Sequence, residues 1–128
     1  MITVLIVDDE PAIVQLVRIT LESDRVHVLE ASDGAAALEQ ALTIRPELIL
    51  LDVDLPDVSG LDLCRRLKSD PVLAQTKIVM LTAAAQHDDV ARGFASGADQ
   101  YLTKPFSPVR LLTLVAELMP SNGPCQRA

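Results

Sequence analysis

Four acidic residues in two short stretches are the part of this sequence best suited to chemistry. Asp8 and Asp9 follow the first apolar run of the chain, and Asp52 follows the third, with Asp54 two residues later. Two carboxylates held a few Å apart repel each other by roughly 4 kcal/mol at an effective dielectric constant near 20. If folding brings these acids together, a cation must lie beside them.

A threonine and a lysine follow two other apolar runs in the same way. Thr82 ends the fourth run, and Lys104 and Pro105 follow the fifth. Oxygen ligands without nearby His or Cys favour Mg²⁺ over zinc. Such a cation and Lys104 can offset the charge on phosphoryl oxygens, while Thr82 donates a hydrogen bond and a carboxylate attacks phosphorus. This combination is typical of phosphoryl transfer, and Asp52 is the candidate nucleophile.

The elements that must position these residues can be predicted from the pattern of apolar residues. Strands are expected at Ile2–Val7, Val26–Ala31, Leu48–Leu51, Lys77–Leu81 and Gln100–Leu102. Helices are expected at Ala12–Leu21, Ala35–Ile44, Leu61–Ser69, from Gln86 to Ser96, and at Val109–Met119. Nearly continuous apolar strands that alternate with helices are typical of a doubly wound α/β domain with a five-stranded parallel sheet.

The shared position of the polar residues is what favours chemistry over a structural role. Each one alone could be a helix cap, a turn residue or a solvated loop charge. In open parallel sheets, however, ligands bind outside the carboxyl ends of the strands. Because four of the five predicted strands end in such residues, we expect these residues to meet at one edge.

Composition excludes several other classes of function. The 128 residues carry a formal charge of −7 and no basic run, which disfavours direct binding to nucleic acid. No apolar run approaches the roughly 20 residues of a membrane span, and no basic residue precedes the apolar N-terminus as in a secretory signal. The two cysteines form no metal spacing or disulfide framework, so we expect a cytoplasmic protein.

The chain resembles the receiver domain of bacterial two-component response regulators, of the chemotaxis-regulator type, in four stretches. These are VLIVDDEP (Val4–Pro11), LILLDVDLPDVSG (Leu48–Gly60), VMLTA (Val79–Ala83) and GADQYLTKPF (Gly97–Phe106). The resemblance implies a flavodoxin-like (βα)5 fold with strand order 2-1-3-4-5. It also implies a receiver domain at residues 1–119, with residues 120–128 as a C-terminal tail or the start of a linker.

The resemblance assigns metal and phosphoryl roles to the acids. Asp52 would be the phosphoacceptor, and Asp9 would bind Mg²⁺ or Mn²⁺ directly. Asp52 would be a second ligand, the backbone carbonyl of Asp54 a third, and Asp8 would act mainly through water.

It also assigns roles to residues at the ends of the fourth and fifth strands. Lys104 would contact the phosphoryl oxygens, and its bond to Pro105 would be cis. Thr82 and Tyr101 would form the switch pair, with Ala83 as a small neighbour. Self-phosphorylation and self-dephosphorylation would be the only reactions, so the chain would not be an enzyme with a separate substrate.

The partners implied are a sensor histidine kinase or a histidine phosphotransfer protein. Phosphorylation would then change binding to an output domain or protein, or to a second copy, through the surface of the fourth helix, fifth strand and fifth helix. Helical spacing places Leu111, Leu114 and Leu118 either on a docking flank of this surface or under a neighbouring helix. On the first helix, Ile19 has a similar pair of interpretations, a surface for the phosphodonor or a place in the core.

Alternatives and one departure from the family pattern remain open at this point. LLDVDL also resembles the Asp-x-Asp motif of haloacid-dehalogenase-type phosphatases, although that motif normally lies on the first strand of a longer chain. A flavin- or nucleotide-binding module is disfavoured, because no Gly-rich loop follows the first strand. Asp54 and Ala84 occupy the positions that flank the attacking water in receiver domains, and we expect the methyl group of Ala84 to contribute nothing to hydrolysis.

Overall fold

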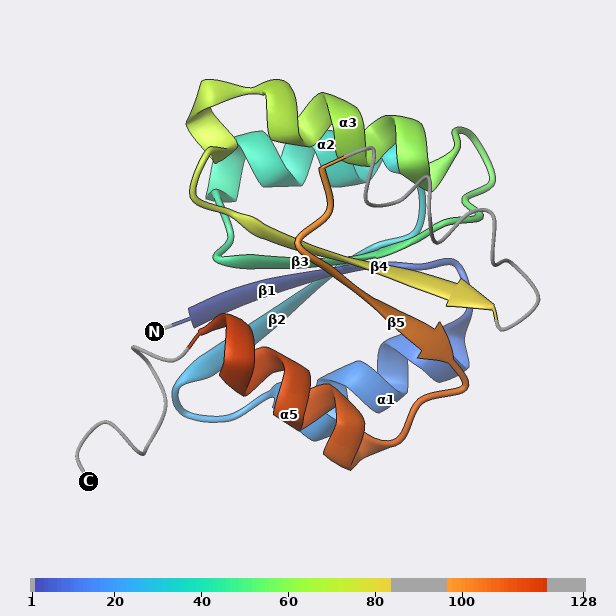
Figure 1. Cartoon of the computed structure of the whole chain (residues 1–128), viewed down its shortest axis with the longest axis vertical. Helices are drawn as coiled ribbons and strands as arrows, with labels where there is room; N and C mark the ends of the chain where they lie inside the picture. Colours follow the sequence, from blue (N-terminus) through green and yellow to red (C-terminus); the bar gives the residue numbers. More distant parts are fainter. Residues whose placement is uncertain (1, 84–96, 120–128) are drawn as a thin grey trace.

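The computed structural model describes residues 2–83 and 97–119 as five strands with helices between them (Figure 1). In chain order the elements are β1 (Ile2–Val7), α1 (Pro11–Leu21), β2 (Val26–Ala31), α2 (Gly34–Ile44), β3 (Leu48–Asp52), α3 (Gly60–Ser69), the 3-10 turn η1 (Pro71–Leu73), β4 (Lys77–Ala83), β5 (Gln100–Lys104) and α5 (Pro108–Leu118). The helix expected from Gln86 to Ser96 and the position of Ala84 lie outside the described residues.

All strands are parallel, and their order is β2-β1-β3-β4-β5, so the predicted fold class and strand order are confirmed. Figure 1 shows α1 and α5 on one face of the sheet and α2 and α3 on the other. Strand order reverses between β1 and β3, so the edge beyond their carboxyl ends is the expected ligand position of such a sheet.

Strands buried on both faces divide the core into two layers. On β3, Leu48 and Leu50 face the layer beneath α1 and α5, whereas Ile49 and Leu51 face the layer beneath α2 and α3. Alternate side chains of a strand point to opposite faces, and both faces here are covered by helices. The nearly continuous apolar pattern of this strand is therefore explained.

Three helices begin at a side-chain cap, and one does not. Asp33, Ser59 and Ser107 accept hydrogen bonds from backbone N–H groups in the first turns of α2, α3 and α5. At α1, Glu10 holds the cap position without such a bond, and Pro11 stands at the start of the helix. The Glu10 side chain is thus not used as a cap, and Asp8 Oδ1 accepts a hydrogen bond from the backbone N–H of Glu10 at 2.9 Å.

The last helix buries two leucines for which a docking flank was one interpretation. Leu111 and Leu114 are buried in the core, and Leu118 packs against it partly buried, so the docking interpretation is wrong for this flank. The reason is that α5 lies against α1 as well as over the sheet, which covers a broader face than the spacing indicated. Its exposed large apolar residues are Val109 and Leu112, which are 71% and 49% exposed.

Ile19 of α1 is 78% exposed, so the interpretation that placed it in the core is wrong. Over the two described ranges, no helix combines the length and apolar character needed to cross a lipid bilayer.

Candidate functional site

The carboxyl ends of three strands bring the predicted charged residues to one edge of the sheet. Asp8 directly follows β1, Asp52 is the last residue of β3, and Lys104 is the last residue of β5. Strands β3 and β5 run longer than the sequence indicated, so Asp52 and Lys104 are held by the ladder itself. Asp8 and Asp52 are both buried.

Lys104 is the cationic centre of this group. Its Nζ lies 2.9 Å from Asp8 Oδ2, 3.3 Å from Asp52 Oδ1 and 2.8 Å from Glu10 Oε1. Only the Glu10 contact has the geometry of a hydrogen bond, and Asp8 Oδ2 accepts none from the described residues, so its pairing with Lys104 is by charge. The Lys104–Pro105 peptide bond is cis, as the resemblance implies.

The positive charge and the hydrogen bond beside Asp52 do not fully offset the cost of burying its negative charge. Burial and the neighbouring charge of Asp8 raise the pKa of Asp52 to about 6, although Lys104 and the backbone N–H of Asp54 lower it. Burial alone would lower the pKa of Lys104, but its contacts with Glu10 and Asp8 outweigh this and raise it. Lys104 therefore stays protonated, and one positive charge faces three carboxylates.

Asp8, Glu10 and Asp52 each place a carboxylate oxygen within 4.8 Å of the others. An all-oxygen donor set with excess negative charge fits Mg²⁺ or Mn²⁺, so the residues present suit the divalent cation that the sequence predicted. Glu10 was missed by sequence reasoning, and its position directly after two site acids was the only signal. Asp9 is exposed and is not part of this group; its role as a metal ligand stays a prediction.

The two residues of the predicted switch pair lie on neighbouring strands. Thr82 is buried near the end of β4, and its hydroxyl donates to the backbone carbonyl of Ala83 at 3.3 Å. Tyr101 is partly buried on β5 and packs against the core layer beneath α2 and α3. Its backbone pairs with Met80, two residues before Thr82. Their role as a switch stays a prediction.

The loop between β3 and α3 is folded tightly against the nucleophile candidate. The backbone N–H of Asp54 donates to Asp52 Oδ1 at 3.3 Å, and Asp54 pairs with Ser59 in an isolated antiparallel bridge. A Cβ at Gly60 would lie 2.0 Å from the backbone oxygen of Asp52. Only glycine allows the first turn of α3 to come this close to the end of β3.

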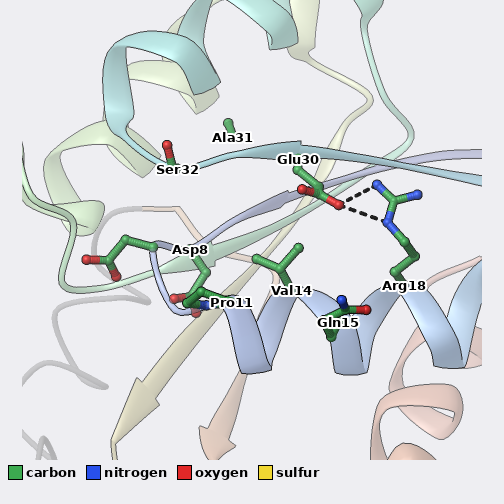
Figure 2. Close-up of a pocket in the computed structure, with 9 residues that line it drawn as sticks. Asp8, Pro11, Val14, Gln15, Arg18, Glu30, Ala31 and Ser32 are labelled. Carbon is green, nitrogen blue, oxygen red and sulfur yellow. Dashed lines mark hydrogen bonds and ion pairs between the residues drawn. The ribbon is translucent and has the colours of Figure 1, made fainter.

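A surface pocket of about 380 Å³ opens beside the site, between α1 and β2 (Figure 2). Asp8, Asp9, Pro11, Val14, Gln15, Arg18, Glu30, Ala31 and Ser32 line it. Arg18 Nε donates to Glu30 Oε2 at 2.8 Å and so ties α1 to the edge strand. Because Asp8 and Asp9 line it, the pocket adjoins the acidic edge on the side of α1.

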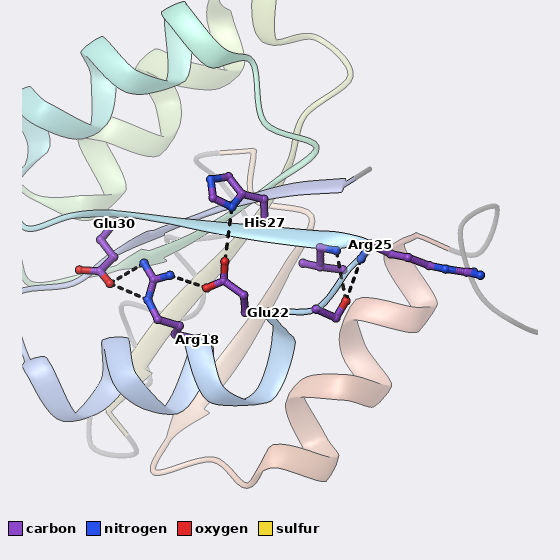
Figure 3. Close-up of polar contacts among 7 residues, drawn as sticks. Arg18, Glu22, Arg25, His27 and Glu30 are labelled. Carbon is purple, nitrogen blue, oxygen red and sulfur yellow. Dashed lines mark hydrogen bonds and ion pairs between the residues drawn. The ribbon is translucent and has the colours of Figure 1, made fainter.

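Arg18 is also the centre of a surface ion-pair network (Figure 3). It pairs with Glu22 one turn further along α1, and Glu22 in turn lies 3.4 Å from His27 on β2. These groups are substantially exposed, so their contribution to stability is small.

Comparison with known proteins identifies the family. A sequence model described as the response regulator receiver domain matches residues 4–116. The DNA-binding dual master transcriptional regulator RpaA of Synechocystis is 45% identical over 116 residues, which are 91% of this chain and 48% of RpaA. The phosphate regulon transcriptional regulatory protein PhoB of Pseudomonas aeruginosa is 41% identical over 95% of this chain and 53% of PhoB. The chain thus spans about half the length of these curated relatives.

Solved structures agree. The chemotaxis response regulator CheY4 of Vibrio cholerae has a TM-score of 0.86 and 34% identity, covering 93% of this chain and 99% of CheY4. The BeF3-activated DrrB receiver domain has a TM-score of 0.84 and 32% identity, covering 94% and 98%. These matches extend over nearly all of the chain, and they favour neither the phosphatase nor the flavin-binding alternative. The chain therefore belongs to the response regulator receiver domain family, the phosphorylation-dependent signalling domains of two-component systems.

Proposed function

We propose that this chain switches state when Asp52 accepts a phosphoryl group from a histidine kinase, a histidine phosphotransfer protein or a small acyl phosphate. The single observation that carries the proposal is the position of the Asp52 carboxylate. It is buried at the end of a central strand, beside one lysine and two further carboxylates. A nucleophile held in this way needs little reorganisation before it reacts.

The residues assigned to the divalent cation are Asp9, Asp52 and the backbone carbonyl of Asp54, with Asp8 acting through water. When bound, Mg²⁺ or Mn²⁺ supplies positive charge that stabilises the phosphoryl oxygens during transfer. The group of Asp8, Glu10 and Asp52 supports the parts assigned to Asp52 and Asp8, and it adds Glu10 as a neighbour that competes for Lys104.

In the transfer step, a carboxylate oxygen of Asp52 attacks phosphorus and forms a new O–P bond. The bond from phosphorus to the donor nitrogen or oxygen breaks, and its electron pair leaves with the donor. Lys104 then exchanges a carboxylate contact for one with a phosphoryl oxygen, and the Thr82 hydroxyl donates to another. The bound phosphoryl group carries a charge of about −1.5 to −2, and these donors stabilise that charge.

The signal leaves the site through Thr82 and Tyr101. As the Thr82 hydroxyl moves toward the phosphoryl group, space opens behind it into which the Tyr101 ring turns. To change an inactive-to-active ratio from 1:99 to 99:1, phosphorylation must favour the active state by about 5.5 kcal/mol. An output domain, a partner protein or a second copy of the chain detects this change by binding the surface around β5 and α5.

The names of the relatives are the basis for any proposal about the output of this signalling domain. RpaA and PhoB are DNA-binding or transcriptional regulators of about twice this length.

We assign residues 1–119 to the receiver domain and residues 120–128 to a tail or the start of a linker. Turnover is limited to phosphorylation and hydrolysis at Asp52, and cysteine usage favours a cytoplasmic location.

Labelling with acetyl phosphate, read by intact mass and peptide mapping, tests the proposal. The parent should gain one phosphoryl group on Asp52 only when Mg²⁺ is present, and Asp52→Asn should gain none. Asp62→Asn is a matched control, because Asp62 lies on the exposed side of α3 and pairs with Arg65. Labelling at another residue, or equal labelling in Asp52→Asn, would refute the proposal.

A further inference from the structure

Asp57, in the loop between β3 and α3, binds the start of a different helix. Its Oδ1 accepts from the backbone N–H of Gly34 at 2.7 Å, and its Oδ2 accepts from Ala35 at 3.1 Å. These two N–H groups belong to the first turn of α2, where no intrahelical partner is available. The hydrogen bond from Gly34 is the main reason why the pKa of Asp57 is lowered. A carboxylate from one loop thus completes the cap of a helix 22 to 23 residues away in the sequence.

The loop and the helix also approach each other too closely for a side chain at the contact. A Cβ at Gly34 would lie 2.4 Å from Val58 Cγ2 and 3.2 Å from Asp57 Oδ1. Glycine at this position lets the loop lie directly on the helix start. The bidentate contact of Asp57 therefore sits in a closely packed junction.

The same loop reaches the nucleophile at its other end. The backbone N–H of Asp54 donates to Asp52 Oδ1, and the bridge between Asp54 and Ser59 closes the loop on itself. Because Asp57 lies between the two bridge partners, a change in its position moves the backbone that orients Asp52. The path from α2 to the site consists of one carboxylate, one short loop and one backbone hydrogen bond.

We propose that Asp57 is a positioning residue for phosphoryl transfer, which holds the backbone of Asp54 against Asp52 by anchoring the loop to the start of α2. This inference rests on the proposed function, in which Asp54 also supplies a carbonyl to the divalent cation. Asp57 touches neither the cation nor the phosphoryl group in this role. It acts by reducing the freedom of the loop that does.

Asp33 provides a control within the same helix. Its side chain accepts from the backbone N–H of Ala36 at 2.8 Å, so it also caps α2, but it does so from the residue directly before the helix. Removing Asp33 weakens the cap without releasing the loop. Removing Asp57 weakens the cap and releases the loop, so the two variants separate a purely structural role from a positioning role.

The experiment compares the parent with Asp57→Ala, Asp57→Asn and Asp33→Ala. For each, Mg²⁺ affinity is measured by calorimetry, the initial labelling rate with acetyl phosphate by intact mass, and Asp54 amide exchange by NMR. We expect Asp57→Ala to weaken Mg²⁺ binding and to slow labelling by about tenfold each, the scale of a residue that supports metal ligands. Asp57→Asn, which keeps one acceptor oxygen, should recover part of both losses. Asp33→Ala should bind Mg²⁺ and be labelled like the parent.

Several outcomes would overturn the inference. Parent-like Mg²⁺ binding and labelling in Asp57→Ala would do so, as would equal losses in Asp57→Ala and Asp33→Ala, because equal losses would reflect helix stability alone. If the parent itself neither bound Mg²⁺ nor was labelled, the proposed function would be wrong, and amide exchange would decide the role of Asp57 in the loop. Faster exchange at Asp54 in Asp57→Ala than in Asp33→Ala would support the anchor, and equal exchange would refute it.

Discussion

Two lysines lie at opposite ends of the strands of the sheet, and their surroundings differ. At the amino ends of β4 and β5, Lys68 Nζ donates to Asp99 Oδ2 and to the Thr76 carbonyl, each at 3.1 Å. Asp99 Oδ2 also accepts from the backbone N–H of Ile78 at 2.8 Å. This group contains one positive charge, one negative charge and backbone partners, so it is balanced and holds elements together.

At the carboxyl ends of the strands, Lys104 faces three carboxylates, two of them buried. Both groups combine a lysine with carboxylates, but at this end the negative charge is in excess. A group that is balanced in the folded chain has no further need of a ligand, whereas an unbalanced buried group is stabilised by one. Charge balance, rather than the presence of an ion pair, separates the functional edge from the structural edge.

Removal of the charge of Lys104 should produce the largest effect. Lys104→Met is expected to slow labelling by acetyl phosphate about 100-fold, the usual scale for loss of one electrostatic donor in a transfer site. The same change should tighten Mg²⁺ binding, because Lys104 no longer competes for the carboxylates. Rates come from intact mass against time and affinity from calorimetry; parent-like labelling would show that Lys104 is structural.

Neutralising Asp52 should stabilise the fold, with a defined dependence on pH. Its folded pKa of about 6 lies above the ordinary value of 3.8, so ionisation is costly in the folded chain. The cost is absent below the lower value, grows between the two and is complete above about pH 6. Asp52→Asn should therefore raise the free energy of unfolding by about 3 kcal/mol at about pH 8 without divalent cations.

This gain should vanish as the pH falls well below the ordinary pKa of 3.8, where the parent carboxyl is protonated in both the folded and the unfolded state. Urea unfolding of parent and variant across this range measures the difference. A gain that did not depend on pH would mean that Asn changes packing rather than charge.

The balanced edge should respond in the opposite way. Lys68→Met leaves Asp99 without its cation and is expected to lower the free energy of unfolding by about 1–2 kcal/mol. Labelling of Asp52 should proceed at the parent rate, because this edge takes no part in transfer. Denaturant unfolding and intact mass measure the two quantities, and a labelling defect in a folded Lys68→Met would break the distinction between the edges.

The exposed network around Arg18 should show the smallest effect. Arg18→Ala removes the contacts to Glu22 and Glu30, and a loss below about 1 kcal/mol is expected because such surface pairs are screened by water. A loss that disappears in high salt would agree with this account. A large, salt-independent loss in thermal unfolding would instead show that Arg18 packs as part of the core.

Much of the fold and the acidic edge could be predicted from the sequence, because both depend on local patterns. The apolar runs identified the strands, and polar residues at their ends identified Asp52, Thr82 and Lys104 before any contact was known. The contacts of Glu10 with Lys104 and of Asp57 with α2 could not be predicted in this way, because neither Glu10 nor Asp57 stands at the end of an apolar run.

For Leu111 and Leu114 the sequence left two interpretations open, and the structure decides for cover by a neighbouring helix. Helical spacing gives the angle between side chains but not the direction in which the helix is turned, and that direction depends on the neighbours. With α1 beside α5, the broader apolar face is covered, and Val109 and Leu112 are left outside. Tertiary contacts decided which of two apolar flanks became the core.

Calorimetric titration of Mg²⁺ into the unphosphorylated chain tests the central claim, that surplus negative charge at Asp8, Glu10 and Asp52 recruits a cation to the nucleophile. The account predicts one ion per chain, with binding at least about tenfold weaker in Asp52→Asn and unchanged in Lys68→Met. An absence of binding heat in the parent at several temperatures, or equal affinity in Asp52→Asn, would contradict it.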